Sequence, residues 1–252
     1  MFGFLDVPVS GAYHLVSWLA SITRPLAGEF ATTLAIVLFT AGVRLLLLPL
    51  SRAAVRGERA RASLAPQLRE LRERHRDDPQ RLQQEVLALH QRSGTSLFAG
   101  CLPMLAQLPF FTVLYRLFSS SSIGAAPNGL LDHALFGAPL GAHWLDVLGA
   151  PSGFWPAGGA VFLGLFALLA VVAWCSSRWQ ARQALLAGTP AGPGVPAGWL
   201  VRVLPFGTLL GAAVLPLAAG VYLLTSTTWA VIERAVLRRG PVGAPAGQDS
   251  RS

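Results

Sequence analysis

The stretch FATTLAIVLFTAGVRLLLLPL, residues 30–50, decides the fold class of this chain. A helix that crosses a bilayer needs about 20 apolar residues, and Arg44 is the only charged residue in the stretch. Arg44 precedes Arg52, where the water-soluble sequence begins, by eight residues. At helical rise it would therefore lie on the order of 12 Å inside the apolar span.

An arginine at that depth predicts a functional site. It costs roughly 2.5–3.5 kcal/mol on insertion scales, and such residues usually face the interior of a bundle or a water-filled cavity. We therefore expect Arg44 to face a wet cavity and not lipid. Two structural alternatives stay open: the guanidinium could bind helix carbonyls, or it could reach the inner membrane surface along its apolar stem.

The composition indicates a polytopic membrane protein without a large soluble domain. Of the 252 residues, 53% are hydrophobic and only 13% are charged. All 20 basic residues are arginine, which we interpret as a coding bias. Because the arginines lie mostly beside apolar spans, the net charge of +8 favours topology signals and contacts with anionic lipid over direct binding of nucleic acid.

No cofactor, metal or nucleotide site is predicted. Cys101 and Cys175 lie in or beside apolar spans, and the five histidines show no ligand spacing. The chain contains no lysine and no Gly-rich phosphate loop. It also offers no membrane-embedded Asp pair, no His cluster and no Ser with a base, so we predict that the protein is not an enzyme.

The expected fold class is an all-α polytopic membrane protein with five transmembrane helices. Residues 199–235 are the hardest to divide. Both flanks are rich in arginine, which favours two short helices with a turn near residues 213–216, and a re-entrant loop is the alternative. The predicted spans are residues 29–51, 97–118, 153–175, 199–213 and 215–235.

Residues 1–28 are predicted to contain an external amphipathic helix that lies in the membrane interface. We expect this helix over residues 10–23, ended by Pro25, with a poorly ordered leader as the alternative. The segment lacks a basic start and a convincing cleavage site, so it does not resemble a removed signal peptide.

The distribution of arginines predicts the orientation in the membrane. Residues 52–92 contain ten arginines, whereas residues 119–152 contain none. Arginine-rich short loops stay in the cytoplasm. The N-terminus and the 119–152 loop are therefore expected outside, and the 52–93 segment, the 176–198 loop and the disordered 236–252 tail inside.

The 52–93 segment is predicted to be a solvated helical hairpin. Leucines recur at helical spacing before the break Asp77-Asp78-Pro79, and a second apolar stripe follows it. Two narrow apolar stripes can face each other in an antiparallel pair. The stripes consist of Leu64, Leu68 and Leu71, and of Leu82, Val86 and Leu89.

Several phrases resemble the YidC/Oxa/Alb family of membrane protein insertases. GTSLFAGCLPMLAQLPFFTVLY, residues 94–115, is similar to the family's second span, and VRLLLLPL, residues 43–50, to the end of its first span. AAGVYLLTSTTWAVIE, residues 218–233, resembles the family's last span. The resemblance covers roughly residues 13–239. Three departures are Ser96-Leu97, Leu223 and Thr227, where many members have Asn-Pro, a second aromatic residue and Asn.

The resemblance implies an insertase and membrane chaperone with a hydrophilic groove open to the cytoplasm and to lipid. Pro103 and Pro109 would shape the second span. The implied groove residues are Arg44, Gln107, Tyr222, Thr225 and Trp229, with Ser226 as a further candidate. Two alternatives stay open. Gln107 could form a hydrogen bond that only packs two helices together, and Tyr222 and Trp229 could be ordinary residues of the membrane interface.

The resemblance also implies the partners: nascent membrane proteins and membrane lipids, with a Sec translocon and the ribosome as candidates. It suggests a monomer. The lack of an Arg/Ser-rich transit peptide favours the bacterial plasma membrane. A small transporter or channel subunit with an anion site at Arg44 is the alternative. That alternative requires a pathway continuous to the outside, and an apolar, closed outer half would count against it.

Overall fold

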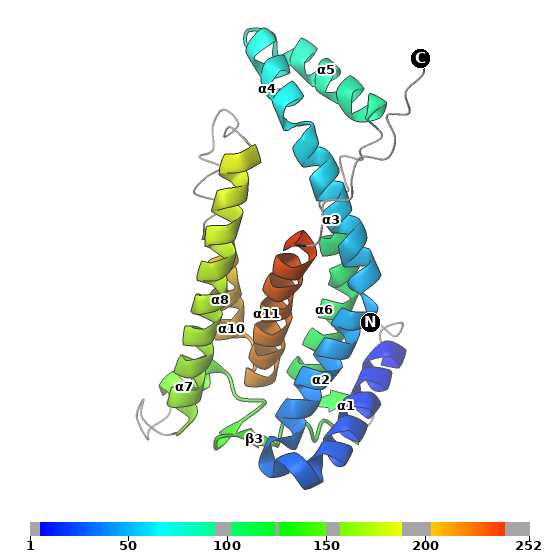
Figure 1. Cartoon of the computed structure of the whole chain (residues 1–252). Coiled ribbons are helices and arrows are strands. Elements are labelled where there is room, and N and C mark those ends of the chain that lie inside the picture. Colours follow the sequence, from blue (N-terminus) through cyan, green and yellow to red (C-terminus); the bar gives the residue numbers. More distant parts are fainter. Residues whose placement is uncertain (1–5, 94–101, 124–125, 150–156, 188–202, 240–252) are drawn as a thin grey trace.

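The computed structural model describes residues 6–93, 102–123, 126–149, 157–187 and 203–239. Within these residues the chain is a bundle of helices with two small β-hairpins at one end (Figure 1). The elements are α1 (Asp6–Ala27), η2 (Gly28–Phe30), α2 (Ala31–Leu46), α3 (Leu48–Ser63), α4 (Ala65–Arg74), α5 (Pro79–Arg92), α6 (Leu102–Ser119), β1 (Ser122–Ile123), β2 (Ala126–Pro127), β3 (Ala134–Leu135), β4 (Ala138–Pro139), α7 (Trp144–Gly149), α8 (Ala157–Ala187), η4 (Leu204–Phe206), α10 (Gly207–Val214) and α11 (Leu217–Arg239).

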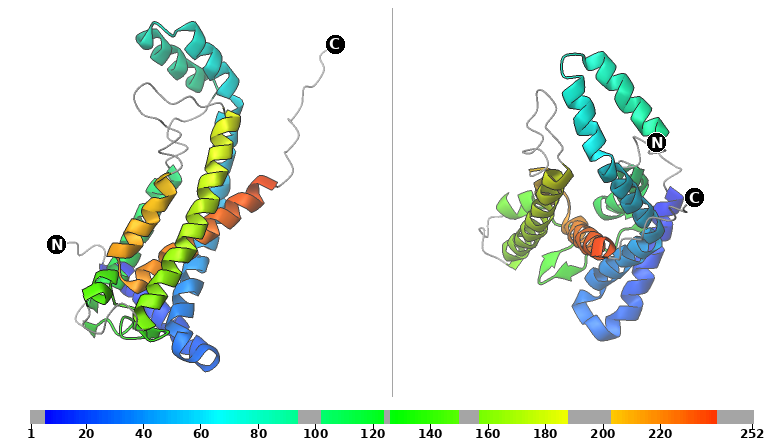
Figure 2. Two further views of the ribbon diagram at one scale, coloured as in Figure 1. Left: turned by 90° about the vertical axis from the view of Figure 1, so that its left-hand side faces the viewer. Right: turned by 45° about the horizontal axis from the view of Figure 1, so that its top comes forward.

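Helix α11 is central to the bundle. It contacts α2, α6 and α8, and Figure 2 shows these helices around it. The buried apolar residues of α2, α6, α8 and α11 form one cluster with residues 130–140. This core lies toward the end of the bundle that carries the strands. Its largest fully buried side chains include Ile36, Leu117, Phe118, Leu140, Phe162, Leu169 and Leu217.

Helix α1 packs along α2 and is longer than the sequence predicts. The expectation that Pro25 ends this helix is wrong, because Pro25 lies inside α1. Pro25 lies in the last turn, where it removes one backbone hydrogen bond without ending the helix before Ala27. The chain reverses instead at Gly28, whose φ is +53°. Only glycine adopts such a backbone without strain. The position of α1 in a membrane interface stays a prediction.

The first apolar span continues into the next helix without a break at residue 52. Leu47 donates to the carbonyl of Val43, and Ser51 donates to that of Leu47, both at 3.0 Å. Helices α2 and α3 therefore form one nearly continuous rod (Figure 1). Helix α8 likewise runs to Ala187, well past the expected start of a loop at residue 176.

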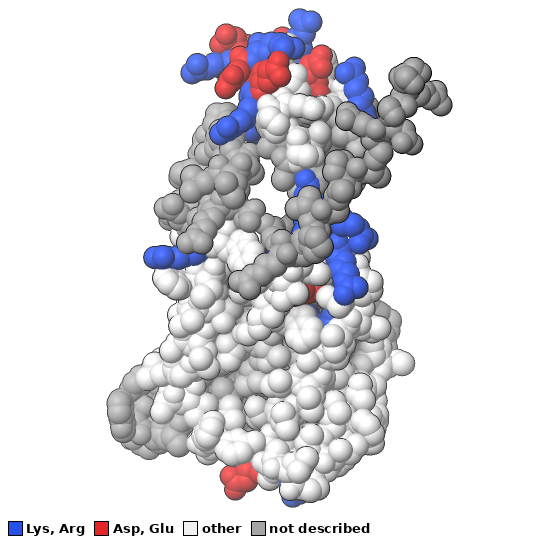
Figure 3. Space-filling model, viewed as in Figure 1, with Lys and Arg blue, Asp and Glu red and all other residues white. Residues whose placement is uncertain are grey.

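Helices α4 and α5 contact each other at the far end of this rod. The turn between them lies at the predicted break, where the Asp78 carboxylate accepts a hydrogen bond from the Arg81 backbone N–H at 3.0 Å. Side-chain oxygens of this kind satisfy free N–H groups at a helix start. Arg and Asp/Glu side chains gather at this end, further Arg side chains lie at mid-height on both sides, and most of the visible surface below them is uncharged (Figure 3).

The opposite end is covered by residues 120–123 and 126–149. Phe136 and Gly137, with φ of 51° and 83°, form the two-residue turn between β3 and β4, as expected of a hairpin turn with two positive φ angles. The backbone of this segment also holds the start of α11. Leu217 and Ala218 donate to the carbonyls of Ala142 and Leu140, both at 2.9 Å.

The break between α10 and α11 lies where the sequence predicts a turn. Leu215 is extended, with φ −84° and ψ 157°, because a residue before proline avoids the helical conformation. In the described part of the chain, two helical stretches are long and apolar enough to cross a membrane by length and composition: residues 6–46, which include the reversal at Gly28, and residues 158–180. The count of five spans stays a prediction.

Candidate functional site around Arg44

Arg44 faces a neighbouring helix and not the outside of the bundle. It lies in the last turn of α2 and is half-buried. Its Nη2 donates a hydrogen bond to Oγ of Ser226, a buried residue of α11. Its Nε is buried and has no hydrogen-bond partner among the described residues. The guanidinium thus has a side-chain partner on another helix and a donor left over.

One face of α11 carries the residues opposite Arg44. Tyr222, Ser226, Trp229 and Glu233 follow one another at intervals of four, three and four residues, which places them on one side of a helix. Tyr222 and Ser226 are buried, and Trp229 and Glu233 are half-buried. Trp229 Nε1 and Glu233 Oε1 are buried atoms without a hydrogen-bond partner in the described part of the chain.

The predicted site residues lie in different surroundings. Arg44, Tyr222 and Trp229 lie on the facing sides of α2 and α11. The Thr225 hydroxyl donates to the Val221 carbonyl of its own helix at 2.9 Å, and Ser226 is the hydroxyl that contacts Arg44. Pro109 is exposed inside α6. The side chains of Gln107 and Pro103 lie outside the described residues.

Glu233 is a site residue that the sequence interpretation missed. Its carboxylate attracts the Arg44 guanidinium, whereas the like charge of Arg234 repels it. The signal was present in the sequence, because Glu233 follows Trp229 by four residues and Ser226 by seven. Within the described residues the site combines two spare donors, Arg44 Nε and Trp229 Nε1, with one spare acceptor, Glu233 Oε1.

On the side toward the strands, the site borders the apolar core, in which the buried polar residues of α2 are Thr32 and Thr40. There α2 presents Ile36 and α11 presents Leu217 and Ala218, all at most 1% exposed. Leu117 and Leu140, both 0% exposed, complete the packing below them. This packing separates Arg44 from the strand-bearing end. Among the described residues, no group of three or more His, Cys, Asp or Glu residues could hold a metal ion.

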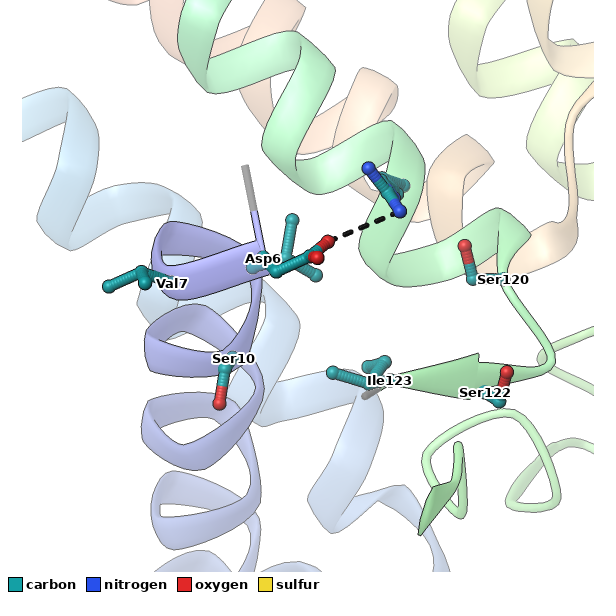
Figure 4. Close-up of a pocket in the computed structure, with 8 residues that line it drawn as sticks. Asp6, Val7, Ser10, Ser120, Ser122 and Ile123 are labelled. Carbon is teal, nitrogen blue, oxygen red and sulfur yellow. Dashed lines mark ion pairs between the residues drawn. The ribbon is translucent and has the colours of Figure 1, made fainter. Parts of the chain in front are cut away.

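Two cavities lie at the strand-bearing end. One, of about 370 Å³, lies beside the ion pair of Asp6 at the start of α1 and Arg116 in the last turn of α6, whose Oδ1 and Nη2 are 3.2 Å apart (Figure 4). The other, of about 870 Å³, is lined by residues that include Arg24, Glu29 and His133. Neither is lined by Arg44 or by any residue of α11.

The arrangement of these elements agrees with a known family. The model of the family described as 60Kd inner membrane protein, the YidC/Oxa/Alb family, matches residues 24–242. The chain belongs to this family. The resemblance drawn from the sequence motifs is confirmed, and the mostly helical fold agrees with a YidC/Oxa/Alb membrane protein.

Bacterial relatives within the family are named membrane protein insertase YidC. The Streptomyces avermitilis relative is 33% identical over 156 residues, which are 58% of this chain and 36% of the relative. The Acidiphilium cryptum relative is 39% identical over 127 residues, 47% of this chain and 21% of the relative. The Chlamydia caviae relative is 31% identical over 150 residues, 60% of this chain and 17% of the relative. The matched parts thus span at most 36% of these relatives' lengths.

Proposed function

We propose that this protein is a membrane protein insertase and chaperone, and that the face between α2 and α11 is its substrate groove. The observation that carries the proposal is the position of Arg44, which contacts Ser226 on α11 and has apolar packing on the side toward the strands. A polar site with apolar packing toward the strands suits a protein that receives a segment and passes it to lipid. The relatives named membrane protein insertase YidC support the same function.

The physical task of an insertase is to move a hydrophilic segment through hydrocarbon. Each unsatisfied backbone group there costs several kcal/mol. Donors and acceptors on α2 and α11 would meet some of those groups and shorten the apolar path. Arg44 would attract acidic residues of the entering segment through a weakly screened field. Tyr222 and Trp229 would form the apolar wall along which the new helix leaves, and Gln107 and Thr225 would line the groove.

The proposed topology has five spans, with the N-terminus outside and the C-terminus in the cytoplasm of a bacterium. It rests on the arginine distribution, which puts the charged α4–α5 end inside. Nascent membrane proteins and lipids are the proposed partners, a Sec translocon and the ribosome are further candidates, and one copy is proposed to suffice. The exposure of Pro109 within α6 is compatible with a role in shaping the groove.

Reconstitution in liposomes tests the function. The substrate is a single-span protein with a short acidic tail, and protection of the tail from added protease measures translocation. Wild type should translocate the tail, and Arg44→Ala should lower the yield by roughly tenfold, which corresponds to about 1.4 kcal/mol. Arg52→Ala is the matched control, because Arg52 is an exposed arginine eight residues further along the same rod.

Equal yields from wild type and Arg44→Ala would remove Arg44 from the mechanism. No translocation by wild type, with ion flux through the same liposomes, would support the transporter alternative instead. The apolar packing on the strand side of Arg44 argues against such a continuous pathway.

A further inference from the structure

Glu233 has no role in the proposed insertion mechanism, although burying part of a carboxylate costs desolvation free energy. Glu233 lies on the same face of α11 as Ser226, and Arg44 lies within its electrostatic reach. None of the ion pairs formed within the described residues joins the two groups. Arg44 uses its Nη2 for Ser226, and Glu233 Oε1 stays buried without a partner.

The two charges therefore act on each other through space, while Arg44 Nε and Glu233 Oε1 have no hydrogen-bond partner among the described residues. In a partly buried site, opposite charges interact more strongly than in water. Glu233 must lower the positive potential at Arg44, and Arg234 offsets only part of this effect, since its own side chain is exposed. An uncharged peptide group has one C=O acceptor and one N–H donor. The C=O could accept from Arg44 Nε or Trp229 Nε1, and the N–H could donate to Glu233 Oε1, which are the unpartnered atoms of the site.

We propose that Glu233 is a specificity-determining residue of the groove, which balances Arg44 so that neutral and acidic segments are accepted with similar affinity. A carboxylate that enters the site is attracted by Arg44 and repelled by Glu233, so an acidic segment binds only slightly more tightly than a neutral one. A neutral segment binds through peptide hydrogen bonds to the spare donors and acceptor. A cationic segment is tolerated because Glu233 offsets its repulsion by Arg44. This role rests on the proposed insertase function.

The test measures binding separately from insertion. Three synthetic peptides share one apolar span and differ only in a tail residue, which is Asp, Asn or Lys. Their dissociation constants are measured with the purified full chain in detergent. Glu233→Gln keeps the size and shape of the side chain and removes its charge. Glu73→Gln is the matched control, because it removes one exposed negative charge on α4.

Glu233→Gln should raise the preference for the Asp over the Asn peptide by at least about fivefold, and should weaken binding of the Lys peptide relative to the Asn peptide. Glu73→Gln should leave both ratios within twofold of wild type. The double variant Arg44→Ala with Glu233→Gln should lose the preference for Asp. Ratios between peptides are used because partial loss of folded protein cancels from them.

Ratios that do not change in Glu233→Gln, or that change equally in Glu73→Gln, would overturn the proposed role. The insertase function is read from a different experiment, the translocation of a neutral tail by wild type in liposomes. Translocation together with unchanged peptide ratios refutes only the role of Glu233. Changed ratios without translocation refute the insertase function and leave the charge balance standing.

Discussion

Removal of the Asn128 side chain should destabilise the cover at the strand-bearing end. Asn128 is 3% exposed. Its Nδ2 donates to the carbonyls of Leu117 at 2.6 Å and Ser120 at 3.0 Å, and its Oδ1 accepts from the Leu130 N–H at 3.3 Å. Carbonyls at the end of a helix lack partners within it, so Asn128 joins the end of α6 to the segment that packs beneath the bundle.

The size of the effect follows from the groups left unpaired. In Asn128→Ala, the carbonyls of Leu117 and Ser120 and the N–H of Leu130 lose their partner, and each buried polar group without one costs about 1–3 kcal/mol. Water can reach the partly buried Ser120 carbonyl, so the two other groups give an expected total of about 2–6 kcal/mol. For a chain of this size that corresponds to a fall in Tm of about 5–20 °C.

Thermal unfolding in detergent, followed by tryptophan fluorescence, measures this change. Trp144 is a suitable reporter, since its ring packs on Phe162 and Phe166 of α8, with centroids 5.8 and 5.3 Å away. Ser121→Ala is the control, because the Ser121 side chain is exposed and its backbone carbonyl, which accepts from Asn128, is retained. A Tm for Asn128→Ala within about 2 °C of this control would refute the reasoning.

Two further predictions concern packing and charge, each read from the same unfolding curve. A Cβ added at Gly220 would lie 2.5 Å from Leu165 Cδ2, so Gly220→Val should lower the stability by about 1–3 kcal/mol through overpacking. Gly220→Ala should be near neutral, because the better helix propensity of alanine offsets the smaller shift of the flexible Leu165 side chain. Equal Tm values for the two variants would contradict this prediction. The side chains of Arg116 and Asp6, which form an ion pair, are 37% and 60% exposed. Arg116→Gln should therefore lower the free energy of unfolding by at most about 1 kcal/mol. A fall in Tm of more than about 5 °C would contradict this and would show that the ion pair holds α1 in place.

Two of the breaks between helices were predictable from the sequence. The phrase Asp77-Asp78-Pro79 predicts a break, and the structure has the Asp78 cap at the start of α5 there. The arginine-rich flanks of residues 199–235 predict a turn near residues 213–216, and α10 and α11 meet at that point, where Pro216 keeps Leu215 extended. The interaction that forms each break joins residues that are close in sequence, so it does not depend on tertiary packing.

Helix ends set by packing or by the membrane could not be predicted in this way. Hydropathy fell after Cys175, and a loop was expected from residue 176, yet α8 continues to Ala187. Residues 176–183, SSRWQARQ, are polar but compatible with a helix. The fall in hydropathy therefore indicates more polar surroundings for this part of α8, and it does not indicate the end of the helix. Pro25 and Gly28 are both helix breakers, and the chain reverses at Gly28. Which of the two ends the helix depends on how α1 packs on α2, which the local sequence does not specify.

Part of the site was also predictable, because Arg44 stands out in an apolar run. Its partner was not, since Ser226, Thr225 and Thr227 all offer hydroxyls in the same phrase. Thr225 and Thr227 donate to the carbonyls of Val221 and Leu223 of their own helix, and only the rotation of α11 about its axis decides which hydroxyl meets Arg44. That rotation is set by contacts with α2, α6 and α8, which are distant in sequence.

The order of residues along α11 explains why polarity ends below Arg44. Leu217 and Tyr222 are buried in the core, and Ser226 and Glu233 follow on the same face. An unpaired charge moved one or two turns toward the strands would enter packed apolar surroundings, where desolvation costs several kcal/mol. The packing that holds α11 in the bundle therefore also separates Arg44 from the strand-bearing end.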